Sequence, residues 1–95
     1  MSGNLVNYIE VQKSVVHENM ERLKKSNPSF NSYNQKEFEL LVVSIMACHE
    51  LKCDKTEEQN QKIRENLHLI KMYEKGDVYI VSIPVDFVDK LRKLE

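Results

Sequence analysis

The sequence predicts a mostly α-helical fold: a three-helix core, one C-terminal β-strand and a short terminal helix. Three observations support this prediction. Apolar residues recur at helical spacing in three long segments, Pro28 separates the first two segments, and a run of β-branched and aromatic residues follows Gly76. Since 95 residues is the length of one small domain, we expect residues 1–95 to form a single helical domain.

The first expected helix runs from about Asn4 to Lys25. Pro28 stops it, because proline cannot continue a helix and the residue before it avoids the helical conformation. A polar loop then covers residues 26–34. The apolar face of this helix has members four and seven residues apart, as in an amphipathic helix: Leu5, Ile9, Val16 and Leu23. The polar residue Gln12 interrupts this face.

The second expected helix begins after Asn34, which can cap it, with Glu37 three residues later. This segment is apolar on nearly all sides, so other elements or a second chain must cover it. The β-branched residues within 40–46 would also suit a buried strand, and periodicity does not decide between the two. The length of the segment and its cap favour a helix.

The third expected helix is capped by Asp54 or Thr56, and acidic residues occupy its first turn, where the helix dipole favours them. Gly76 is expected to end it in the left-handed conformation. Its apolar line consists of Ile63, Leu67, Ile70 and Tyr73.

Residues 77–83 are rich in β-branched and aromatic side chains and lie before Pro84, which predicts a strand, and helical spacing resumes near Val85. A lone strand needs a partner for its backbone donors and acceptors. With residues 40–46 assigned to a helix, we expect pairing with the same segment of a second copy, about a two-fold axis. The alternatives are an extended segment lying across the helices and a partner strand elsewhere in the chain. The expected homodimer interface consists of Val78, Tyr79, Ile80, Val81 and Ile83.

Composition excludes several classes of protein. Hydrophobic residues make up 41% and charged residues 31%, a globular balance, and the net charge of −1 argues against coating nucleic acid or an anionic membrane. Two glycines are too few for a glycine-rich phosphate loop. The sequence shows no leader-like N-terminus and no apolar run long enough to span a bilayer, so we expect a cytoplasmic protein.

Cys48 and Cys53 lie five residues apart, and on one helix their side chains would diverge by about 140° and could not form a disulfide. Free thiols fit a reducing cytoplasm. His49 and Cys53 have the spacing of two zinc ligands on one helical face, with Glu50 beside His49, but no third ligand is evident. We therefore predict no metal, no cofactor and no catalytic residues.

These observations favour a non-enzymatic protein-interaction module. We expect a small regulator or inhibitor, of the kind that phages and mobile elements encode, which binds a protein partner as a homodimer. The first alternative is a DNA-binding regulator of winged-helix or ribbon-helix-helix type, although the mixed charges of the third helix disfavour nucleic acid. The second is a small-ligand (nucleotide) sequestering protein, in which tyrosines stack on the ligand and Lys24 and Lys25 contact a phosphate.

Overall fold

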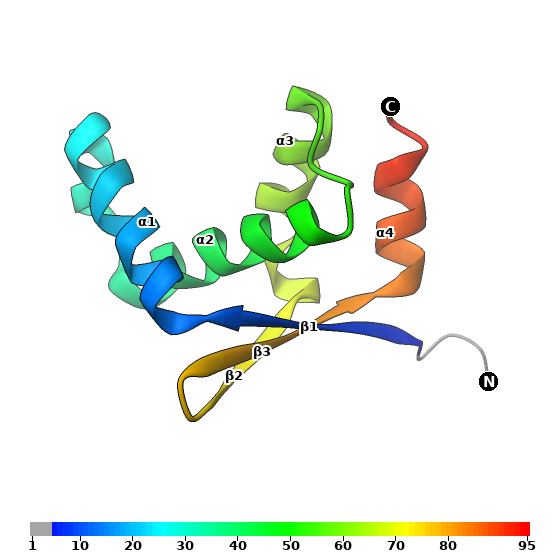
Figure 1. Cartoon of the computed structure of the whole chain (residues 1–95). Helices are drawn as coiled ribbons and strands as arrows, with labels where there is room; N and C mark the ends of the chain where they lie inside the picture. Colours follow the sequence, from blue (N-terminus) through cyan, green and yellow to red (C-terminus); the bar gives the residue numbers. More distant parts are fainter. Residues whose placement is uncertain (1–4) are drawn as a thin grey trace.

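The computed structural model describes residues 5–95, so Asn4, the expected start of the first helix, lies outside the described residues. Three antiparallel strands form one sheet in the order β1-β3-β2, and the helices lie on one side of it (Figure 1). The prediction of a mostly α-helical fold with one strand is therefore wrong. The elements are β1 (Val6–Gln12), α1 (Lys13–Ser26), η2 (Pro28–Ser32), α2 (Gln35–Glu50), α3 (Glu57–Glu65), η3 (Leu67–Leu69), β2 (Lys71–Lys75), β3 (Val78–Pro84) and α4 (Val85–Arg92), with η2 and η3 being 3₁₀ helices.

The first half of the expected first helix is strand β1. Ile9 and Val11 face the helices, whereas Tyr8 and Glu10 face the opposite side, so the segment follows the two-residue period of a strand. Helix α1 begins only at Lys13, directly after the polar residue that interrupts the apolar face, and it ends at Ser26 ahead of Pro28, as predicted.

The third expected helix is also shorter than predicted. Thr56 caps α3 through a capping box with Gln59, and the helix ends at Glu65. The chain then passes through η3 into strand β2, so Gly76 does not end a helix. It adopts a φ of 60° in the two-residue loop between β2 and β3, where a hairpin needs glycine in the first position.

Strand β3 is the centre of the sheet. Its backbone pairs with β1 on one edge and with β2 on the other, with Ile9 and Met72 both opposite Val81. The predicted pairing of this strand across a two-fold axis is therefore wrong, because both of its hydrogen-bonding edges are occupied within the chain. The expected lack of a partner strand followed from assigning β1 and β2 to helices.

Helix α2 and helix α4 confirm the sequence prediction. The Asn34 side chain accepts hydrogen bonds from the backbone N–H groups of Lys36 and Glu37, so α2 starts where the cap predicts. Residues 40–46 are helical, which settles the choice between helix and strand. The sheet and the other helices cover α2, whose side chains Phe38, Leu41, Val42, Val43, Ser44, Ala47 and Cys48 are buried.

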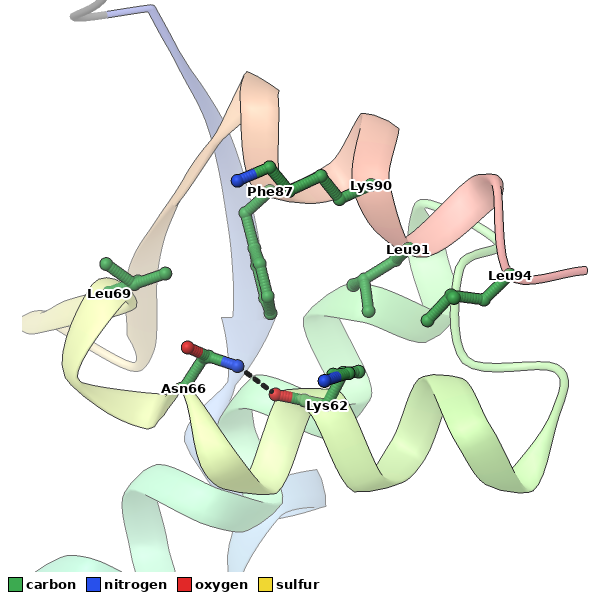
Figure 2. Close-up of a pocket in the computed structure, with 7 residues that line it drawn as sticks. All are labelled: Lys62, Asn66, Leu69, Phe87, Lys90, Leu91 and Leu94. Carbon is green, nitrogen blue, oxygen red and sulfur yellow. Dashed lines mark hydrogen bonds between the residues drawn. The ribbon is translucent and has the colours of Figure 1, made fainter.

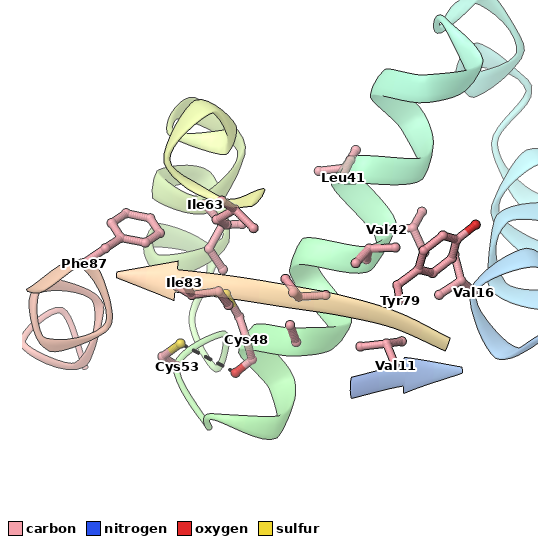
Figure 3. Packing of buried hydrophobic residues seen from close by; sticks show 14 of the residues in the cluster. Val11, Val16, Leu41, Val42, Cys48, Cys53, Ile63, Tyr79, Ile83 and Phe87 are labelled. Atoms are coloured by element: carbon pink, nitrogen blue, oxygen red, sulfur yellow. Dashed lines mark hydrogen bonds between the residues drawn. The ribbon is translucent and has the colours of Figure 1, made fainter. Parts of the chain in front are cut away.

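The core lies between the inner face of the sheet and the helices (Figure 3). Tyr79, Val81 and Ile83 of β3 are buried against it, and Ile63 of α3 and Leu91 of α4 close its other side. No helix within residues 5–95 is both long enough and apolar enough to cross a lipid bilayer.

Candidate protein-interaction surface

The side of the sheet opposite the helices, here called the outer face, carries the two most exposed tyrosines of the described residues. Alternation along three paired strands places every second side chain on it. Tyr8 and Tyr73, from the two edge strands, are 68% and 58% exposed. The outer face consists of Tyr8, Glu10 and Gln12 from β1, Val78, Ile80 and Ser82 from β3, and Lys71, Tyr73 and Lys75 from β2.

The outer face has a half-buried centre and oppositely charged edges. Ile80 lies at the centre, with Glu10 directly opposite on β1 and Tyr73 directly opposite on β2. On the β2 side, Lys71 pairs with Ser82 and Lys75 pairs with Val78. Among the described residues, neither these lysines nor Glu10 form an ion pair. The acid on one edge and the bases on the other are therefore available to a charged partner.

The predicted interface residues divide between the two faces of β3. Tyr79, Val81 and Ile83 point into the core and are at most 1% exposed. Val78 and Ile80 lie on the outer face and are partly exposed. Sequence reasoning missed Tyr8 and Tyr73 as members of the same surface, because they come from strands that were expected to be helical.

The hydroxyl of Tyr79 reaches the edge of the core and joins three elements. It donates a hydrogen bond to Glu39 of α2 at 2.7 Å, and Nε2 of His17 in α1 lies 3.2 Å from the same oxygen. Burial, followed by the hydrogen bond to Glu39 and the nearby negative charges, raises the pKa of Tyr79 above its ordinary value of 10.0. This contact joins the central strand to α1 and α2.

Because the Tyr79 hydroxyl is buried and bonded to Glu39, the free energy of unfolding should depend on pH at high pH, and Tyr79→Phe should remove this dependence. Above about pH 10 the tyrosine ionises in the unfolded chain but stays neutral in the folded one, so its contribution is complete below that pH and is lost as the pH rises. Above about pH 10, the free energy of unfolding of the wild type should fall relative to that of Tyr79→Phe by about 1.4 kcal/mol per pH unit.

Urea unfolding of both proteins at about pH 9 and about pH 11 measures this difference. Tyr73→Phe is the control, because it removes the same hydroxyl group from an exposed position on the sheet. Equal pH slopes for the wild type and Tyr79→Phe would contradict the assignment.

The residues weighed as zinc ligands do not converge. His49 is exposed and its Nδ1 lies 3.3 Å from a carboxylate oxygen of Asp54, whereas Cys53 is fully buried beyond the end of α2. Within residues 5–95 no three histidine, cysteine or acidic side chains form a group that could hold a metal ion.

A groove of about 250 Å³ lies between α3, η3 and α4 (Figure 2). Phe87 and Leu91 of α4 and Leu94 just after it supply its apolar wall, and Lys62 and Lys90 stand at its rim. An apolar groove with two cations suits an anionic amphiphile. The small-ligand alternative would need such a groove, and it stays a prediction.

The tyrosines expected to stack on such a ligand do not gather in one place. Tyr8 and Tyr73 lie on the outer face, Tyr79 is in the core, and Tyr33 packs edge-on against Phe30 at 5.4 Å between ring centroids. None of the four lines the groove between α3 and α4.

The comparisons with known proteins return no match: no family model, no curated protein and no solved structure is similar to this chain.

Proposed function

We propose that this protein is a non-enzymatic, cytoplasmic protein-interaction module that self-associates through the outer face of its sheet and acts as a small regulator or inhibitor. The observation that carries the proposal is the uncovered outer face, with Ile80 at its centre between two strands that each expose a tyrosine. Tyrosine is enriched at protein interfaces because it buries a large apolar area and keeps a polar end. Two cysteines that are free and buried fit a reducing compartment.

The charges on the outer face favour a second copy of this chain as its occupant. In aligned face-to-face packing, the strands of two sheets run within about 30° of each other. A two-fold axis parallel to the strands places β1 of one copy opposite β2 of the other, so the Glu10 edge meets the edge with Lys71 and Lys75. An axis perpendicular to the strands would instead place acid opposite acid. The segregated charges therefore select one of the two symmetric arrangements.

Charge reversal tests this arrangement. Glu10→Lys should weaken the dimer at least about tenfold, because like charges then oppose each other across the interface. The double variant Lys71→Glu/Lys75→Glu should weaken it similarly, and combining all three changes should restore it. Native mass spectrometry and sedimentation velocity at micromolar concentration give the dissociation constants.

The matched control is Glu18→Lys, which makes the same charge change at an exposed position of α1. It should leave the dimer unaffected. A wild-type chain that stays monomeric at these concentrations, or a triple variant that fails to recover the dimer although it is folded, would count against the proposal.

The DNA-binding alternative predicts binding to duplex DNA, whereas the proposed function predicts self-association through the outer face. Binding to duplex DNA through phosphate contacts should weaken steeply as salt is raised. No feature of the outer face favours this alternative, since its single acid and two lysines nearly balance. Its ribbon-helix-helix form needs an unpaired edge on β3, and both edges are occupied.

A further inference from the structure

Helix α2 ends in a turn that reverses the chain at Lys52. This residue has a φ of 57° in the left-handed region, where glycine is usual. The backbone N–H of Lys52 donates to the carbonyl of His49 at 3.0 Å, and that of Cys53 donates to the carbonyl of Cys48 at 3.1 Å. These two bonds define a Schellman motif.

The Schellman motif brings the two cysteines together. In this motif the residue that follows the left-handed position usually contacts the residue five positions before it, and here these residues are Cys53 and Cys48. The Sγ of Cys53 lies 3.5 Å from the carbonyl oxygen of Cys48, and both side chains are fully buried (Figure 3). The thiol of Cys53 donates this contact to the backbone of the residue whose own side chain it neighbours.

The geometry removes the condition on which the sequence argument against a disulfide rested. That expectation placed both of them on one helix, with diverging side chains. Because the chain reverses at Lys52, Cys53 is outside the helix and its side chain turns back onto the last turn of α2.

We propose that Cys48 and Cys53 are a redox-active dithiol that closes to a reversible intrachain disulfide when a peroxide oxidises it. The Cys53 thiol already contacts the backbone of Cys48 in the reduced protein, so the turn holds the two cysteines as neighbours before any oxidation. In a reducing compartment such a disulfide would be transient, as regulatory disulfides are. The proposal does not depend on the interaction function proposed above.

The surroundings of the two thiols assign their order of reaction. The Arg92 guanidinium donates to the carbonyl of Leu51 at 2.8 Å and so lies beside this turn. The neighbouring Cys48 thiol and the positive charge of Arg92 lower the pKa of Cys53, although burial and the charge of Asp54 oppose them. The neighbouring Cys53 thiol and burial raise the pKa of Cys48. Cys53 is therefore the thiol that ionises first and attacks the peroxide.

The reaction balances in two steps. The Cys53 thiolate attacks one oxygen of hydrogen peroxide, the O–O bond breaks, and after proton transfer Cys53 is a sulfenic acid and one water has left. The sulfur of Cys48 then attacks the sulfenic sulfur, the S–O bond breaks, and the hydroxyl leaves with the Cys48 proton as a second water. The two thiols together lose two electrons and two protons, and the peroxide is reduced to two waters.

Peroxide treatment of the folded, full-length chain tests the proposal. After oxidation, the protein is denatured and alkylated with a maleimide, and its intact mass is measured. The wild type should lose two hydrogens and take up no maleimide, and dithiothreitol should restore two reactive thiols. Because Lys52 lies between the cysteines, trypsin should release a two-chain peptide that reduction separates.

Single variants test the order of attack. Cys48→Ser should stop at a sulfenic acid on Cys53, which dimedone traps, whereas Cys53→Ser should react much more slowly. Three outcomes would overturn the proposal: a wild type that keeps both thiols free, one that is oxidised only to sulfinic or sulfonic acids, or one that forms only disulfides between chains. Equal dimedone labelling of the two single variants would overturn the assignment of Cys53 as the attacking thiol.

Discussion

Replacing Gln59 with leucine is expected to lower the free energy of unfolding by about 3 kcal/mol. The side chain of Gln59 is fully buried. Its Oε1 accepts hydrogen bonds from the backbone N–H groups of Lys55 and Thr56 at 2.6 and 2.9 Å. Its Nε2 donates to the carbonyl oxygen of Leu91 at 2.8 Å, which ties the start of α3 to α4. Leucine fills a similar volume but leaves these three backbone groups without their partner, at about 1 kcal/mol each.

Thermal unfolding followed by circular dichroism measures this effect. For a domain of this length, a loss of about 3 kcal/mol corresponds to a fall in Tm of about 12–24 °C. Gln61→Leu is the matched control, because Gln61 lies on the same helix but is exposed and should change stability by less than about 0.5 kcal/mol. Similar losses for the two variants would show that the buried hydrogen bonds of Gln59 contribute nothing specific.

The elements that sequence reasoning predicted correctly have strong local signals. Asn34 and Thr56 cap their helices through hydrogen bonds to backbone groups two or three residues ahead, so both ends of each interaction lie in one short segment. Pro28 stops α1 for an equally local reason. Strand β3 is recognisable from its composition alone, since most of its residues are β-branched or aromatic.

The two strands that were missed lack a decisive local signal. Leu5 and Ile9 are four residues apart, which is about one helical turn and also two repeats of a strand. Strand β2 contains Lys71, Met72, Tyr73, Glu74 and Lys75, with few residues of high β propensity, so pairing with β3 decides its conformation. In both cases a contact distant in sequence overrides the local preference.

The same reason limits prediction of the candidate site. The outer face combines Tyr8 with Ser82 and Tyr73 with Ile80, and only the strand register reveals these pairs. The dithiol is hidden for a different reason: Lys52 adopts a left-handed conformation that sequence reasoning normally assigns to glycine or asparagine. Without that turn, nothing in the spacing of the cysteines predicts their contact.

Replacing Phe38 with alanine is expected to have the largest effect of any substitution considered, a loss of about 4 kcal/mol of stability. Phe38 is 1% exposed near the start of α2. Its ring stacks on that of Phe30 at 5.1 Å between centroids, and the ring of Tyr33 lies 6.1 Å away. The Lys24 ammonium at the end of α1 stands 5.7 Å from its centroid. One ring therefore contacts α1, η2 and the residue after η2, so its removal leaves a cavity and also loosens the connection between two helices.

Urea unfolding at low temperature measures the loss, since a chain of this length has a total stability of about 5–14 kcal/mol and the variant should retain part of it. Tyr33→Ala is the control within the same aromatic cluster. Tyr33 is 47% exposed, so its truncation should cost about 1 kcal/mol. Hydrogen exchange should also accelerate over residues 28–34 in Phe38→Ala, because the 3₁₀ segment loses the ring against which Phe30 packs. If the two variants lose similar stability, the cluster is a surface contact and Phe38 does not connect α1 to α2.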